Sequence, residues 1–240
     1  MTYCVGLLLN DGIVLLSDTR TNAGLDNIST YRKMFLFEDP GERVIAIMTA
    51  GSLSVTQTTV ARLREAIEDP DATEDTSIMT APTMLKVADI VGNMLAEVRA
   101  EIDEKMSAMQ GVTASMIVAG QRKGGAMRLF LIYPEGNFIE ATEDTPFLQI
   151  GEHKYGKPIL DRVVKPQTSL QDAQKAVLLS MDSTLRSNLS VGMPLDLCVI
   201  ERDACKVTLT RRIEAGDEQF REMSEAWSRA LRDGFSQINL

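Results

Sequence analysis

Residues 2–18 read TYCVGLLLNDGIVLLSD, two apolar runs joined by Asn10, Asp11 and Gly12. An Asn-Asp-Gly step between apolar runs is typical of a tight β-hairpin. We therefore expect Thr2 to begin a strand that is paired within a sheet. Chain ends are usually frayed and exposed, so a buried start at Thr2 calls for a physical reason.

A chemical reason lies in the threonine itself. Threonine is small enough for the initiator methionine to be trimmed, which leaves Thr2 with an α-amine of pKa about 7.7–8.0. A threonine paired with its own amine is one of the few hydroxyl nucleophiles that work without histidine. Lys33 adds positive charge that favours deprotonation of the hydroxyl, and Asp18, at the end of the second run, keeps Lys33 charged and oriented.

Four short motifs follow one another along the first part of the chain: Thr2, Ser17-Asp18-Thr19-Arg20 with Gly24, Arg32-Lys33 and Ala50-Gly51. Together they resemble the proteasome β-type subunits, which are N-terminal-nucleophile hydrolases. Residues 1–5, 18–24 and 28–34 are similar to the bacterial proteasome-related branch called Anbu. The resemblance covers most of the chain and implies a four-layer αββα sandwich with threonine-type endopeptidase activity.

The resemblance also assigns roles around the nucleophile. It implies that the backbone amide of Gly51 forms part of an oxyanion hole, where one donor contributes about 2.7–4 kcal/mol to transition-state stabilisation. Thr21 and Asn22, together with Gly51, are expected to bind an extended peptide by strand addition. Gly51 also fits a plain strand-to-helix corner, and the two interpretations are compatible.

Two positions depart from the family pattern. The usual Gly-Ser-Gly is replaced at its serine by Glu152, and the usual Arg-Asp-x-x-Ser-Gly places Ser187 at the aspartate and Ser190 at the supporting serine. A carboxylate facing the Thr2 amine would raise the pKa of that amine and slow turnover. Alternatively, Glu152 is a solvated loop residue, and both serines are simple hydrogen-bonding groups at a helix end.

Composition excludes several other classes of function. A net charge of −9 without clustered Lys and Arg argues against nucleic-acid binding. Cys4, Cys198 and Cys205 show no metal-type spacing and are expected to be buried, reduced thiols. A single histidine, His153, excludes multi-histidine metal centres, and no nucleophile elbow accompanies it. We therefore expect no metal and no cofactor.

No apolar run reaches the ~18 residues of a membrane span, so no membrane partner is expected. Thr2 already starts the first strand, and we expect neither a signal peptide before it nor a location other than the cytoplasm.

Hydrophobic periodicity predicts an α+β fold without βαβ alternation. Strands are expected at 2–9, 13–16, 33–37, 44–50, 113–119, 128–133, 138–141, 147–151, 195–200 and 206–213. Helices are expected at 52–68, 83–109, 157–163, 169–188 and about 217–234, with Ser52 and Ser169 as caps. Residues 22–30 are expected to be a loop or irregular edge, and 1–240 a single domain.

Three functions remain open. The first is an N-terminal-threonine peptidase that hydrolyses peptides or unfolded polypeptides inside a self-compartmentalising or open homo-oligomer, a ring or a spiral. The second is a catalytically weak assembly or binding protein that keeps the fold, which the departures at Glu152 and Ser187 suggest. The third is an N-terminal-nucleophile amidase acting on small amides. The sequence indicates neither the substrate preference nor an ATPase partner.

Overall fold

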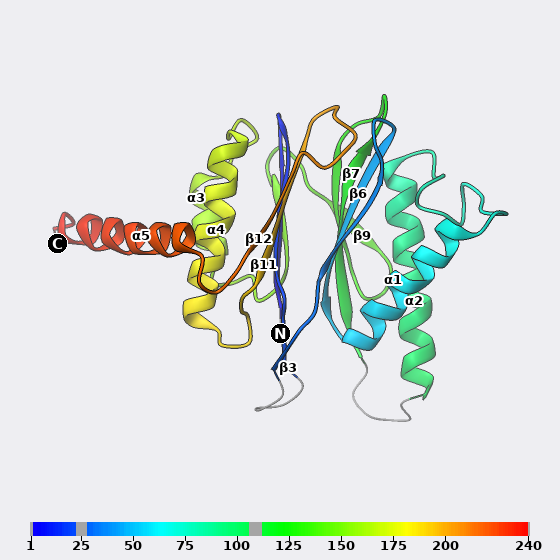
Figure 1. The fold of residues 1–240 in the computed structure, drawn as a ribbon, viewed down its shortest axis with the longest axis horizontal. Helices are drawn as coiled ribbons and strands as arrows, with labels where there is room; N and C mark the ends of the chain where they lie inside the picture. Colours follow the sequence, from blue (N-terminus) through cyan, green and yellow to red (C-terminus); the bar gives the residue numbers. More distant parts are fainter. Residues whose placement is uncertain (1, 23–27, 106–111, 240) are drawn as a thin grey trace.

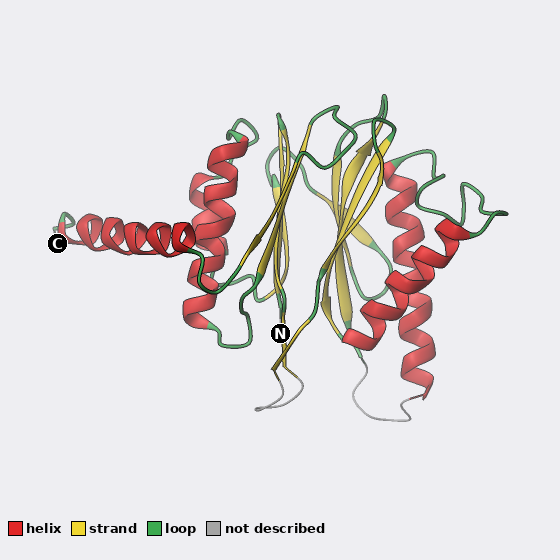
Figure 2. Cartoon of the chain, viewed as in Figure 1, coloured by secondary structure: helices red, strands yellow, loops and turns green. Residues whose placement is uncertain are grey.

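The computed structural model describes residues 2–22, 28–105 and 112–239, and two five-stranded antiparallel sheets lie face to face at its centre. Helices α1 and α2 cover the outer face of one sheet, and α3 and α4 cover the outer face of the other (Figure 1). Figure 2 shows the resulting order of layers: helices, sheet, sheet, helices. The predicted four-layer αββα architecture is confirmed.

The strands are ordered differently in space and in sequence. The first sheet runs β10 (Phe147–Gly151), β1 (Tyr3–Leu9), β2 (Gly12–Asp18), β11 (Leu195–Glu201) and β12 (Leu209–Ile213). The second runs β5 (Met34–Asp39), β6 (Arg43–Gly51), β7 (Ala114–Arg122), β8 (Arg128–Ile132) and β9 (Phe138–Glu140). The helices are α1 (Leu53–Glu68), α2 (Met84–Lys105), α3 (Lys157–Val163), α4 (Leu170–Ser187) and α5 (Glu218–Ser236).

The middle of the first sheet is buried on both faces. Along β2, Val14 and Leu16 pack toward α3 and α4, whereas Ile13 and Leu15 pack against the second sheet. This alternation follows from the two-residue period of a strand. Because both faces are covered, β2 needs an apolar run rather than an alternating pattern, and the hairpin predicted around Gly12 forms with Leu9 opposite it.

Some boundaries differ from the predictions. The short strand β3 (Arg20–Asn22) ends at the start of the stretch expected to be a loop, and its partner strand β4 (Ile28–Thr30) lies within that stretch, while Gly24 lies outside the described residues. Helix α2 ends at Lys105, and residues 106–109 of the predicted helix also lie outside them. The last strand is shorter than predicted and begins at Leu209.

The two predicted helix caps behave differently. Ser169 accepts a hydrogen bond from the amide of Asp172 (3.1 Å), as an N-cap should. Ser52 precedes α1, but its side chain makes no capping bond, and its Oγ lies 3.0 Å from Oγ of Ser54 instead. The capping prediction for Ser52 is therefore wrong because a neighbouring hydroxyl competes for the same oxygen.

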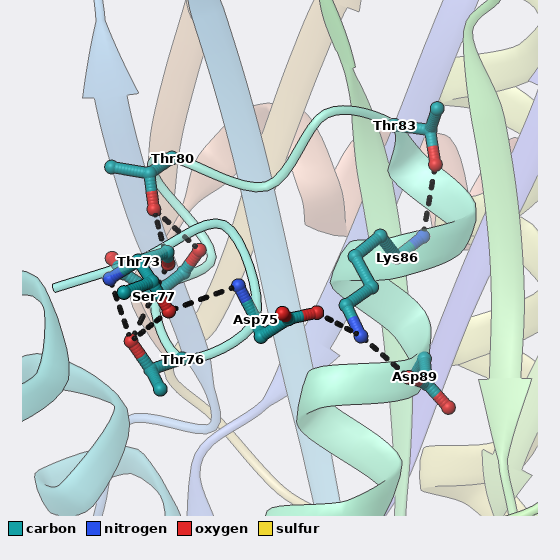
Figure 3. A network of polar contacts seen from close by, with 8 residues as sticks. All are labelled: Thr73, Asp75, Thr76, Ser77, Thr80, Thr83, Lys86 and Asp89. Atoms are coloured by element: carbon teal, nitrogen blue, oxygen red, sulfur yellow. Dashed lines mark hydrogen bonds and ion pairs between the residues drawn. The ribbon is translucent and has the colours of Figure 1, made fainter.

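The connector between α1 and α2 is held by hydroxyl groups (Figure 3). The Thr80 hydroxyl donates to the Thr73 carbonyl (2.7 Å), and Thr83 accepts from the amide of Lys86 (3.1 Å) at the start of α2. Lys86 also pairs with Asp75 (2.9 Å) and Asp89 (3.2 Å). These bonds fix a surface segment that contributes no residue to the site described below.

Helix α5 leaves the sandwich and runs outward from α4 (Figure 1). Its first turns pack on the body through Phe220 and Ser224, whereas Leu231, Phe235 and Ile238 near its far end are 53%, 80% and 72% exposed. Large apolar side chains that are exposed so close together in the sequence are unusual on a monomer surface.

Candidate active site

Asp18 lies at the end of β2 and is fully buried. Its Oδ1 accepts hydrogen bonds from the ammonium of Lys33 (2.7 Å) and from the backbone amide of Tyr3 (3.1 Å). Its Oδ2 accepts from the amide of Gly192 (3.2 Å). Three separate segments therefore hold this one carboxylate in place.

Lys33 sits just before β5 and is only 5% exposed. Its Nζ donates to Asp18 and to the carbonyl of Arg20 (2.6 Å), and its own carbonyl accepts from the amide of Thr49 (2.9 Å). An unpaired buried ammonium would be costly, and these oxygens stabilise its charged form. Burial raises the pKa of Asp18, and the Lys33 ammonium opposes that rise most strongly.

Thr2 is fixed in the sheet rather than frayed. It is 7% exposed, and its carbonyl accepts a hydrogen bond from the amide of Glu152 (2.7 Å). Gly151 pairs with Tyr3 and has φ +80°, and a Cβ at this glycine would lie 1.9 Å from the Thr2 carbonyl oxygen. Only glycine lets β10 approach the start of the chain this closely.

The same oxygen of Asp18 joins Lys33 to the residue after Thr2. Because Oδ1 binds both the Lys33 ammonium and the Tyr3 amide, the start of β1 and the lysine share one acceptor. The start of β1 beside Thr2, Asp18 and Lys33 are thus brought together around a buried carboxylate, as the sequence predicts for these three residues. Their catalytic roles stay predictions.

Gly51 ends β6, two residues beyond the Thr49 amide that binds Lys33. It has φ +104°, and a Cβ there would lie 2.4 Å from the carbonyl oxygen of Thr113. A side chain is therefore excluded, and the exposed backbone of Gly51 faces solvent at the corner where α1 begins.

Ser187, predicted at the place of the family aspartate, and Ser190, predicted at the place of the supporting serine, lie apart from this hydrogen-bond network. Ser187 is exposed at the end of α4, and Ser190 is half-buried, with its amide bound to Oδ1 of Asn188 (2.9 Å). Within the described residues neither hydroxyl makes a hydrogen bond. The turn that carries them reaches Asp18 through the Gly192 amide instead.

Gly192 is a site residue that sequence analysis missed. A Cβ there would lie 2.2 Å from Nε of Arg20, whose guanidinium donates to the Leu189 carbonyl (2.9 Å). Thr19 also holds this turn, because its hydroxyl donates to the Pro194 carbonyl (2.7 Å). The only sequence signal was a glycine two residues before a proline, which is too common to be specific.

Glu152 contacts the start of the chain through its backbone amide, which donates to the Thr2 carbonyl. Its side chain makes no hydrogen bond to another described residue. Its side chain is half-buried, and no ion pair to it occurs among the described residues.

The expected peptide-binding segment is β3. Thr21 pairs with Ser29 and Asn22 with Ile28, so one edge of β3 is occupied by β4. In the described part of the chain the other edge of β3 has no strand beside it. Thr21 and Asn22 thus lie on a short edge strand close to the Arg20 carbonyl that binds Lys33.

The remaining chemistry-bearing groups fit a structural role. Cys4, Cys198 and Cys205 are buried free thiols, and burial raises the pKa of Cys198 to about 12. Among the described residues, no three His, Cys, Asp or Glu side chains are grouped to hold a metal ion. In the same residues no helix has the length and apolar character of a membrane span.

The chain matches the family described as proteasome subunit over residues 2–200. It is 24% identical to the proteasome subunit beta of Haloquadratum walsbyi over 86% of this chain and 76% of that protein. It is 25% identical to proteasome subunit beta 2 of Pyrobaculum calidifontis over 84% of this chain and 90% of that protein.

Solved structures give higher identities. The Anbu (Gly-1) mutant from Hyphomicrobium sp. strain MC1 is 52% identical, with a TM-score of 0.94 over 100% of this chain and 99% of that one. Anbu (ancestral beta-subunit) from Yersinia bercovieri is 42% identical, with a TM-score of 0.92 over 99% and 98%. The Anbu complex of Pseudomonas aeruginosa, described as a helical assembly, is 41% identical, with a TM-score of 0.92 over 99% and 97%. With full-length matches at these identities and the site geometry above, the chain belongs to the proteasome subunit family and, within it, to the Anbu (ancestral beta-subunit) proteins.

Proposed function

We propose that this chain is an N-terminal-threonine peptidase, in which Thr2 supplies both the attacking hydroxyl and the base. The observation that carries the proposal is the buried Asp18 carboxylate, which binds the Lys33 ammonium and the amide directly after Thr2. A fixed ammonium near the start of the chain lowers the cost of forming an alkoxide.

The reaction begins at the Thr2 hydroxyl, once Met1 has been removed. The hydroxyl oxygen attacks the peptide carbonyl while the Thr2 amine takes its proton and passes it to the leaving amine. The Gly51 amide stabilises the negative oxygen of the tetrahedral intermediate. Water then hydrolyses the ester and restores the free threonine.

A peptide substrate is held on the free edge of β3, where the backbones of Thr21 and Asn22 pair with an extended chain. Residues 1–240 act as one domain in this scheme. The substrates are peptides or unfolded polypeptides, since an edge strand pairs with extended backbone.

We further propose that the protein works as a homo-oligomer. The exposed apolar side chains near the end of the described chain, Leu231 and Phe235 on α5 and Ile238 just beyond it, support this because such side chains are normally covered. The helical assembly described for the Anbu complex of Pseudomonas aeruginosa points to the same property. A mass in solution equal to one chain of 26.4 kDa would contradict the proposal.

A β-lactone tests the nucleophile directly. Attack by the Thr2 oxygen opens the lactone ring, forms an ester and adds the whole mass of the lactone to the protein. Intact-mass spectrometry should show one adduct per chain on a threonine N-terminus, and none in Thr2→Ala. Retention of Met1, or an unchanged adduct yield in Thr2→Ala, would contradict the mechanism.

The weakly catalytic alternative has one specific observation in its favour. Ser187 and Ser190 do not bind Asp18 or Lys33 through their hydroxyls within the described residues, so support for the amine is reduced. Stoichiometric β-lactone labelling without turnover of any peptide would favour that alternative over the peptidase.

A further inference from the structure

A cavity of about 360 Å³ lies between the start of β5 and helix α1. Its walls combine aromatic, polar and cationic side chains with two small apolar ones: Tyr31, Arg32, Phe35, Gln57, Val60, Ala61 and Arg64. No carboxylate is among these lining residues. The cavity is therefore electropositive in a chain whose net charge is −9.

The two arginines of this cavity have no carboxylate partner in the part of the chain that the structure describes. Within the described residues, neither Arg32 nor Arg64 makes an ion pair or hydrogen bond to a carboxylate. By contrast, Arg62 on the same helix binds Glu101 (2.6 Å). The guanidinium of Arg64 stacks on the ring of Phe35, 5.5 Å from its centroid, which orients the cation and leaves its N–H groups for a ligand.

A second cavity, of about 310 Å³, also includes Arg32 but differs in charge balance. Its other two arginines are neutralised, because Arg211 binds Asp217 (2.8 Å) and Arg212 binds Asp196 (3.0 Å). Of these two cavities, the one against α1 is the one that combines two guanidinium groups without a carboxylate partner among the described residues.

This cavity adjoins the candidate active site through both of its walls. Tyr31 and Arg32 directly precede Lys33, and α1 begins two residues after Gly51. The elements that carry the ammonium and the oxyanion donor therefore continue into the cavity walls.

We propose that this cavity binds an acidic side chain, aspartate or glutamate, on the residue whose carbonyl Thr2 attacks. The carboxylate pairs with the guanidinium groups of Arg32 and Arg64, and the methylene groups pack on Phe35 and Val60. This inference rests on the proposed peptidase function and names its preferred substrate class.

Peptidyl vinyl sulfones that differ only in their last residue test the inference. The Thr2 oxygen adds to the vinyl carbon while the hydroxyl proton goes to the neighbouring carbon, so the protein gains the whole mass of the probe. Rates of this gain are compared for probes ending in Glu, Gln, Leu and Lys. We expect the Glu probe to react about tenfold faster than the Gln probe, as two partly exposed ion pairs allow.

Arginine variants test whether this cavity causes the preference for the Glu probe. Arg32→Gln/Arg64→Gln should bring the Glu-to-Gln rate ratio close to one, and Arg64→Glu should shift the preference toward the Lys probe. Arg229→Gln removes the same charge on α5, which runs outward from α4 on the side of the molecule opposite α1 (Figure 1), and should leave the ratio unchanged. Added salt should lower the ratio in the unmodified protein only.

The outcomes separate the two proposals. If every probe labels Thr2 but Glu and Gln probes react equally fast, the acidic preference is wrong and the nucleophile stands. If no probe labels Thr2 at all, the peptidase mechanism fails, and the inference fails with it. An Arg229→Gln effect as large as that of the double variant would show that net charge, not the cavity, sets the preference.

Discussion

The Asp18–Lys33 pair and the turn after α4 are two regions that face the same centre but are built differently. The pair is buried and is carried by strand ends. Asp18 accepts hydrogen bonds from the amides of Tyr3 and Gly192, and Lys33 donates to the Arg20 carbonyl. The turn is open to solvent, with Leu189 86% exposed, and touches Asp18 through one amide at 3.2 Å. Groups on strand ends are fixed by the whole sheet, whereas groups on a turn depend on a few local bonds.

The largest effect on stability is expected when the Asp18–Lys33 ion pair is broken. Lys33→Met leaves the fully buried Asp18 without its cation, which should lower the free energy of unfolding by about 3–5 kcal/mol. Denaturant unfolding at fixed protein concentration measures this difference. The double variant Asp18→Asn/Lys33→Met removes the stranded charge and should recover part of the loss. A loss below about 1 kcal/mol in the single variant would show that the pair is not isolated from water.

A second effect tests how tightly β10 holds the start of the chain. Gly151→Ala combines φ +80° with a Cβ 1.9 Å from the Thr2 carbonyl oxygen, and we expect a loss of about 2–3 kcal/mol in unfolding free energy together with slower β-lactone labelling. Gly41→Ala is the matched control, since Gly41 has φ +88° with no atom within 4 Å of the added Cβ.

The turn responds differently to the same kind of change. In Gly192→Ala the Cβ meets the flexible Arg20 side chain rather than backbone, so we expect a loss of about 1 kcal/mol or less. The Gly151 prediction has its own contradicting outcome. Equal losses of unfolding free energy in Gly151→Ala and Gly41→Ala would mean that backbone strain alone, and not the contact with Thr2, destabilises the Gly151 variant.

Alkaline pH should weaken the anchoring of β1 on α4. The hydroxyl of Tyr3 lies 2.6 Å from Oγ of Ser180 and accepts from Gln149 (2.5 Å), and burial raises the pKa of Tyr3 to about 12. In the unfolded chain this phenol ionises near pH 10. Above that pH the unfolded state binds fewer protons than the folded state, so stability falls as pH rises toward 12.

The size of this effect follows from the two pKa values. The Tyr3 contribution should fall by about 2 kcal/mol between roughly pH 9 and 11.5. Tyr3→Phe is less stable at neutral pH but lacks this part of the slope, while the buried thiols titrate in both proteins. Parallel stability curves for the two proteins over this range would contradict a protonated, buried phenol.

The sequence predicts the regular strands and helices well and the turn after α4 poorly. The Gly12 hairpin, the Ser169 cap and the layer order were predictable because strand and helix periods are local and the family motifs are specific. Asp18 and Lys33 were predictable as partners because both sit at element ends with few alternatives. The Gly192 contact was not predictable, because it depends on how a turn after α4 packs on Arg20.

The Ser52 cap and the β3–β4 pair show a second limit. A serine before a helix has several acceptors and donors within reach, and the Ser54 hydroxyl is one of them. Three-residue strands such as β3 carry too little periodic signal to be separated from a loop. Sequence patterns therefore predict the Asp18–Lys33 pair at the strand ends. The irregular segments around this pair become visible only in the structure.

The smallest effect is expected at Ser187, where resemblance and geometry disagree. The resemblance places this serine where the family usually has an aspartate, which predicts a strong loss on substitution. Its side chain is exposed, and no described group binds it, so we expect Ser187→Ala to change the unfolding free energy by less than about 0.5 kcal/mol and β-lactone labelling by less than about twofold. Ser187→Asp, which restores the family residue, should be equally mild if exposure governs the position. A large gain in labelling with Ser187→Asp alone would instead mean that the turn closes on Thr2 during the reaction, and that the serine itself holds activity down.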